Sequence, residues 1–127
     1  MILGIGTDII ALKRVQEALQ RSGKAFMDRV FTPDEQEQAR NKPFPEQYLA
    51  LLFAGKEAVF KTLGAPWDQG VTLRDIEIRE GPKGEPLPQL NGRLAQLARA
   101  KGAIGVWVSL SFEDDYAIAF AVLEGAS

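Results

Sequence analysis

The chain has 127 residues, of which 46% are hydrophobic and 25% are charged, and 15 basic against 17 acidic residues give a net charge of −2. This composition predicts a globular protein with one core and a single domain over residues 1–127, and the lack of a basic excess argues against a nucleic-acid partner. The sequence contains no cysteine and no histidine. Disulfides, thiolate zinc sites, serine-histidine triads and imidazole-bound metals are therefore excluded, so carboxylates, lysines, hydroxyls or water must carry any acid-base or metal chemistry.

The N-terminus predicts a short strand followed by an amphipathic helix. Residues 2–5 are apolar, and Gly4 and Gly6 indicate that another part of the fold packs closely against this strand. Residues 9–21 have apolar side chains at helical spacing, and Gly23 is expected to end the helix. The segment lacks the features of a signal peptide, and no stretch reaches the length of a membrane span. We therefore expect a cytoplasmic protein with no membrane contact.

Two more helices are predicted next. Thr32 is a suitable N-cap and Pro33 a suitable first residue for a short helix. The longest helix is predicted over Glu46–Leu63, where large apolar side chains recur at helical intervals, and Gly64 and Pro66 are expected to close it.

The rest of the chain alternates between strands and one further helix. Residues 71–80 alternate as a strand does, and a Gly/Pro-rich loop follows in which residues 87–90 are expected to form a short edge strand. The remaining expected elements are a helix over residues 93–101 and a hairpin of residues 105–112 and 116–123 joined by an acidic turn. This order predicts an α+β domain with an antiparallel sheet.

The second strand of that hairpin has two different faces. Large side chains fall on one face and three alanines, Ala117, Ala119 and Ala121, fall on the other. The alanine face would let either a helix or a second subunit approach closely.

Three acidic or basic residues are candidates for chemistry. Asp8 lies in an apolar run, where a carboxylate is costly unless it caps a helix, pairs or binds a cation, and local sequence favours the cap. Glu57 and Lys61 are four residues apart and share one helix face, flanked by small alanines that would admit a substrate. A surface ion pair is the simpler interpretation of that spacing.

Two other features indicate binding. Residues 11–30 contain five basic and two acidic side chains, and Arg14 and Arg21 share a face that either is simply solvated or docks an acidic protein. The loop of residues 81–88 could present backbone amides to a nucleotide, with Lys83 adding charge, although such loops are usually only turns.

Taken together and in this order, these segments resemble the holo-acyl-carrier-protein synthase family of 4′-phosphopantetheinyl transferases. The sequence GIGTDII followed by Arg14 is similar to that family's N-terminal motif, and FAGKEAVFKTLG is similar to its central Phe-x-x-Lys-Glu-Ala-x-x-Lys-x-x-Gly motif. Later landmarks are GxP before LNG, and SLS before YAIAFAV. The resemblance covers nearly the whole chain. It implies a phosphopantetheinyl transferase-like α+β fold, in a homotrimer with active sites between neighbouring subunits.

The resemblance also implies a reaction, in which the 4′-phosphopantetheine arm of coenzyme A passes to a serine hydroxyl of an apo-acyl carrier protein. It implies Mg²⁺ held by Asp8 and Glu57, with Glu57 or water as general base and Lys61 stabilising the transition state. The acidic carrier protein would dock on Arg14 and Arg21. The residues implied to contact coenzyme A are Lys56, Lys61, Gly64, Lys83, Gly84 and Pro86.

Three positions depart from the family pattern. Ala11 stands where Glu is common, Leu52 where Arg is usual and Phe112 where His is common. These losses motivate an alternative function, that of a degenerate family member which binds carrier protein or nucleotide without catalysis. A third interpretation is an unrelated magnesium-dependent phosphohydrolase, because two carboxylates and a lysine serve that reaction too.

Overall fold

The computed structural model describes residues 1–65 and 70–127, so the predicted helix-closing Pro66 lies outside the described residues. The strands are β1 (Ile2–Ala11), β2 (Ile76–Glu80), β3 (Pro86–Leu90), β4 (Ala103–Glu113) and β5 (Tyr116–Gly125). The helices are α1 (Leu12–Val30), α2 (Pro33–Arg40), α3 (Pro45–Leu63) and α4 (Gly92–Ala100), with a short 3₁₀ turn at Leu73–Asp75. No helix in the described part of the chain is long and apolar enough to cross a membrane.

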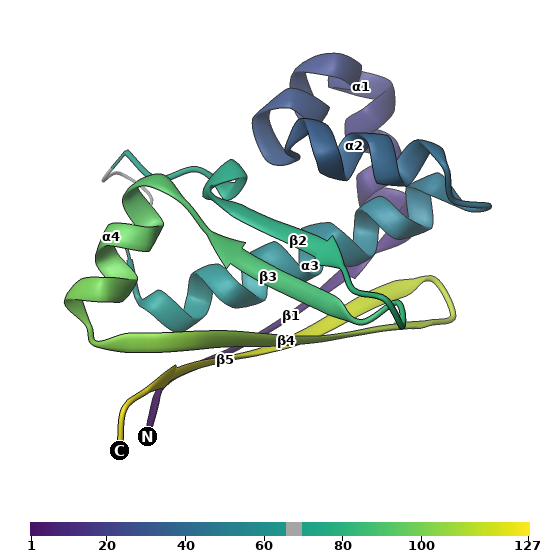
Figure 1. Ribbon diagram of the computed structural model, residues 1–127. Helices are drawn as coiled ribbons and strands as arrows, with labels where there is room; N and C mark the ends of the chain where they lie inside the picture. Colours follow the sequence, from purple (N-terminus) through teal and green to yellow (C-terminus); the bar gives the residue numbers. More distant parts are fainter. Residues whose placement is uncertain (66–69) are drawn as a thin grey trace.

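Helix α3 is the central element of the fold (Figure 1). It packs on an antiparallel sheet with the strand order β1-β5-β4, and the separate antiparallel pair β2-β3 packs against the same helix. Helices α1 and α2 lie together near the N-terminal end of α3, and the two chain termini lie side by side (Figure 1). The predicted α+β class is confirmed, but the strands form two sheets where the sequence suggested one.

Strand β1 extends further than the sequence predicted. Residues 9–11, which were expected to begin a helix, stay extended because they pair with residues 116–118 of β5. The helix starts only at Leu12, whose backbone N–H donates to the Asp115 carbonyl at 2.7 Å. The pairing of β1 with β5 therefore overrides the helical spacing of these three residues.

Two other predicted boundaries are also wrong. Gly23 does not end α1 but kinks it, with φ 45° and ψ −113°, and the helix continues to Val30 because residues beyond the kink reach the core again. The strand predicted over residues 71–80 begins only at Ile76, because Thr72 caps a 3₁₀ turn before it.

The alanine face of β5 is covered within the chain itself. Ala117, Ala119 and Ala121 are buried under α3, which presents the equally small Ala50, Ala54 and Ala58. Of the two alternatives for this face, the helix is the correct one. The opposite face of the sheet leaves large apolar side chains exposed, namely Ile5, Ile9, Trp107, Tyr116, Ile118 and Phe120.

Candidate active site

Two glycines of β1 bring α3 unusually close to the sheet. A Cβ atom on Gly4 would lie 2.1 Å from the Thr62 carbonyl oxygen, and one on Gly6 would lie 2.0 Å from the Ala58 carbonyl oxygen. Any larger residue would therefore push the helix away. Side chains alternate along a strand, so Asp8 points to the same side as these glycines, toward α3.

Asp8, Glu57 and Lys61 meet at this contact. The Lys61 ammonium lies 3.3 Å from Oδ1 of Asp8 and donates a hydrogen bond to the Thr7 carbonyl at 2.9 Å. Asp8 is not a helix cap, because the N-cap of α1 is Ala11 and has no side-chain hydrogen bond. Glu57 lies one helical turn before Lys61, as its spacing predicted.

The charges of Asp8 and Lys61 both act on Glu57. Partial burial raises the pKa of Glu57 above its ordinary value, the negative charge of Asp8 raises it further, and Lys61 acts in the opposite direction. The carboxylates of Asp8 and Glu57 and the ammonium of Lys61 therefore interact electrostatically where β1 meets α3. In the described ranges, 1–65 and 70–127, no third Asp or Glu joins the pair to make a larger metal-ligating group.

A match to a protein-family model identifies the family of this chain. The family model described as "4′-phosphopantetheinyl transferase superfamily" matches residues 4–121, which include all three residues. The chain belongs to the 4′-phosphopantetheinyl transferase superfamily.

Relatives and solved structures agree with this family. The holo-[acyl-carrier-protein] synthase of Desulforudis audaxviator (strain MP104C) is 43% identical over 127 residues, which are 100% of this chain and 96% of the relative. The crystal structure of holo-[acyl-carrier-protein] synthase from Neisseria meningitidis has 37% identity and a TM-score of 0.89, covering 98% of this chain and 99% of that chain. A Bacillus anthracis synthase in complex with CoA (3′,5′-ADP) has 32% identity and a TM-score of 0.81, covering 99% of each chain. The predicted family and enzyme class are confirmed.

The predicted coenzyme A residues of the loop lie apart from these three residues. Gly84 and Pro86 line a cavity of about 280 Å³ beside Lys42, Tyr48 and Leu52, and Lys83 is exposed next to it. This turn between β2 and β3 lies at the other end of the fold from Gly64, the left-handed C-cap of α3 (Figure 1). This single chain therefore does not bring all of its predicted coenzyme A residues together.

Lys56 is placed differently from its predicted role. Its side chain is 0% exposed and forms an ion pair with the buried Glu35, on the side of α3 that faces α2 and β2. Because the ammonium reaches no surface, this geometry gives no support to direct contact between Lys56 and coenzyme A.

The predicted docking residues are accessible. Arg14 and Arg21 are exposed on α1 before its kink, and neither has an ion-pair partner among the described residues. Lys24, by contrast, pairs with Asp28 in the same helix. Two unpaired guanidinium groups on one helix face are suited to an acidic surface.

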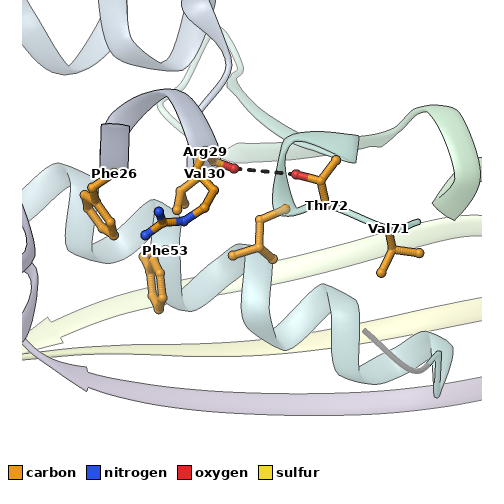
Figure 2. A pocket seen from close by; sticks show the side chains of 7 residues that line it. Phe26, Arg29, Val30, Phe53, Val71 and Thr72 are labelled. Carbon is orange, nitrogen blue, oxygen red and sulfur yellow. Dashed lines mark hydrogen bonds between the residues drawn. The ribbon is translucent and has the colours of Figure 1, made fainter. Parts of the chain in front are cut away.

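The sequence did not reveal an apolar cavity of about 530 Å³ beside the second half of α1 (Figure 2). Phe26 and Phe53 stack on one side of it, with ring centroids 6.2 Å apart, and Val71 and Thr72 lie across from them. The cavity joins three segments that are distant in sequence, so no local pattern could have indicated it. It contains none of the predicted site residues.

Proposed function

We propose that this transferase moves the 4′-phosphopantetheine arm of coenzyme A to a serine hydroxyl of an apo-acyl carrier protein, and that adenosine 3′,5′-bisphosphate is the other product. The observation that carries the proposal is the convergence of Asp8, Glu57 and Lys61 at the contact between β1 and α3. The proposal is supported by relatives that are holo-[acyl-carrier-protein] synthases and that match this chain over nearly their full lengths.

Asp8 and Glu57 would hold Mg²⁺. Their carboxylates lie close enough that the charge of Asp8 raises the pKa of Glu57, a repulsion that a divalent cation would relieve. Magnesium favours oxygen ligands and commonly takes only one or two protein carboxylates, so the pair fits. When bound there, the ion would offset negative charge on the pyrophosphate of coenzyme A.

The side chains themselves would supply positioning and proton transfer. Lys61, which contacts both Asp8 and the Thr7 carbonyl, would hold its ammonium against phosphate oxygens as charge develops there. Glu57 would accept the proton from the serine hydroxyl as that oxygen attacks the β-phosphate, unless water takes this role.

Arg14 and Arg21 would dock the carrier protein. Both are exposed and lack acidic partners among the described residues, and α1 begins directly after the strand that carries Asp8. An acidic carrier bound along this helix would gain association rate and orientation from the charge complementarity.

A homotrimer with intersubunit active sites would bring the separated coenzyme A residues together. Within one chain, Gly84 and Pro86 line a cavity that none of Asp8, Glu57 and Lys61 lines, so the loop of one subunit would serve the carboxylates of the next. The outward face of the β1-β5-β4 sheet supports such an assembly. Trp107 is 61% exposed and Phe120 51%, and a row of large apolar side chains on one face is typical of an interface.

The direct test is the mass of the carrier protein. Apo-carrier incubated with the chain, coenzyme A and Mg²⁺ should gain the mass of one phosphopantetheine arm, and chelation of the metal should abolish the gain. No gain in mass with a range of apo-carriers would refute the proposal.

The two alternative functions are less well supported. The departures at Ala11, Leu52 and Phe112 lie outside the group of Asp8, Glu57 and Lys61, and Leu52 is a buried residue of α3. Carrier binding measured by calorimetry, without any gain in mass, would favour the degenerate member. Phosphate release from coenzyme A in the absence of a carrier would favour the phosphohydrolase.

A further inference from the structure

A second lysine-carboxylate pair lies inside the fold, on another side of α3 from the candidate active site. Lys56 and Glu35 are both 0% exposed, and the Lys56 ammonium donates to Oε1 of Glu35. The same oxygen accepts the Thr32 backbone N–H at 3.0 Å, and Oε2 accepts the Ile78 backbone N–H at 2.8 Å. The Lys56 ammonium also lies 5.5 Å from the centroid of the Phe31 ring. One carboxylate thus joins the start of α2, the middle of α3 and strand β2.

The side of α3 that faces the β1-β5-β4 sheet is packed largely through small groups, while larger buried side chains such as Leu49 and Val59 also hold the helix. Towards the sheet, the Ala58 and Thr62 carbonyls lie against the two glycines of β1, and α3 and β5 pack together with buried alanines on each. Small side chains permit close approach, but they form shallow ridges and grooves that interlock weakly. A buried ion pair adds a contact of defined direction, and in some proteins buried polar groups specify one register over others.

The two sides of α3 are coupled through consecutive residues. Lys56 directly precedes Glu57, so a rotation of the helix that moves one moves the other, and Lys61 follows one turn later. A misplacement of about 1 Å at a reacting group costs on the order of 10²-fold in rate. The orientation of Lys56 is therefore important for the geometry around Asp8.

We propose that Lys56 is a positioning residue: its buried pair with Glu35 sets the rotation of α3 that directs Glu57 and Lys61 toward Asp8. This inference rests on the proposed function for its catalytic consequence. It assigns Lys56 a role inside the protein in place of a contact with coenzyme A.

The experiment removes both charges together, because a single unpaired buried charge could unfold the chain. In the double variant Glu35→Gln/Lys56→Met, Gln keeps an acceptor for one of the two backbone N–H groups and Met keeps the length of the lysine stem. Glu35→Asp, which keeps both charges but shortens the acid by one methylene and so displaces the pair, is a second variant if the double variant does not fold. The matched control is Glu77→Gln, which alters a buried acid of the same region that hydrogen-bonds Thr32 and Arg79 and has only a longer-range charge interaction with Lys56.

Three kinds of measurement separate positioning from stability. Melting temperature reports folding, kcat and KM for coenzyme A report catalysis, and the dissociation constant of Mn²⁺, measured by electron paramagnetic resonance without substrate, reports the carboxylate geometry. We expect the double variant to melt near the control, with kcat about 10- to 100-fold lower, KM for coenzyme A little changed and Mn²⁺ affinity about tenfold weaker. The control should keep the wild-type kcat and Mn²⁺ affinity.

The outcomes distinguish this inference from the proposed function. A double variant with wild-type kcat and Mn²⁺ affinity, or a control that loses as much as the double variant, overturns the positioning role. A wild-type chain that binds Mn²⁺ but modifies no carrier overturns the proposed function, and the Mn²⁺ constants still decide the positioning role. A wild-type chain that neither binds Mn²⁺ nor modifies a carrier overturns both.

Discussion

Helix α3 contributes the lysine to two lysine-carboxylate pairs that lie in opposite environments. In the first pair, Nζ of Lys61 lies 3.3 Å from Oδ1 of Asp8, and the two side chains are 52% and 17% exposed. In the second pair, the Lys56 and Glu35 side chains are 0% and 1% exposed. Charges near water attract weakly but can exchange partners, so the first pair can bind a ligand at little cost to the fold. Charges out of water have lost their hydration and depend on each other, so the second pair can only hold structure. The same two residue types thus serve binding in one place and positioning in the other.

The largest effect should come from breaking the buried pair on one side only. Lys56→Met leaves the Glu35 carboxylate buried without its ammonium, and we expect a loss of about 3–5 kcal/mol in the free energy of unfolding. Urea denaturation followed by circular dichroism measures this. The double variant Glu35→Gln/Lys56→Met should recover much of the loss; if it is no more stable than Lys56→Met, the unpaired charge is not the cause.

Breaking the exposed pair should give the opposite result. Asp8→Ala should reduce kcat/KM for carrier modification by about 10²- to 10³-fold, because it removes a carboxylate from the reacting region. The free energy of unfolding should change by less than about 1 kcal/mol. Steady-state kinetics and urea denaturation of one preparation test both statements. A variant as unstable as Lys56→Met would show that Asp8 is structural.

Lys61→Met tests the ammonium of the exposed pair. We expect kcat to fall by about 10²-fold, since the cation near the phosphates is lost, with a change of at most about 1 kcal/mol in stability. Lys61→Arg keeps the charge but not the shape of the ammonium, and it should restore part of kcat. Equal loss in both variants would indicate that geometry matters more here than charge.

The sequence singled out Asp8, Glu57 and Lys61 but not the Lys61–Asp8 contact, and it gave no sign of the buried pair, for a physical reason. The spacing of Glu57 and Lys61 is a local property of a helix, and the even positions of β1 place Gly4, Gly6 and Asp8 on one side. The family resemblance then assigned them a shared role. The partner of Lys56 is 21 residues away, on an element whose docking no local pattern specifies.

The missed boundaries have the same cause. At residues 9–11 the pairing with β5 overrides helical spacing, and at Gly23 renewed burial carries α1 past a residue that would normally end it. Likewise, the alanine face of β5 could be read from its alternation, but only the packed fold shows that α3 covers it and that the aromatic face remains open. Long-range packing decides what local patterns leave undetermined.

The smallest effect, and the sharpest test of the exposed site, concerns Glu57→Gln. Burial and the charge of Asp8 raise the pKa of Glu57 above the ordinary 4.5, so ionisation of this carboxyl costs the folded state free energy. Wild-type stability should therefore decrease as pH rises from about 4.5 through the raised pKa, whereas a glutamine does not titrate. Without metal, the free energy of unfolding of Glu57→Gln should match that of the wild type at low pH. At pH 7 it should exceed the wild-type value by up to about 1 kcal/mol, because Glu57 is only half-buried.

Excess Mg²⁺ should reverse the order of stability at pH 7, since it stabilises only the protein that keeps both carboxylates. Thermal melts at several pH values, with and without Mg²⁺, measure this; a variant less stable than the wild type without metal would show that Glu57 and Asp8 do not repel each other.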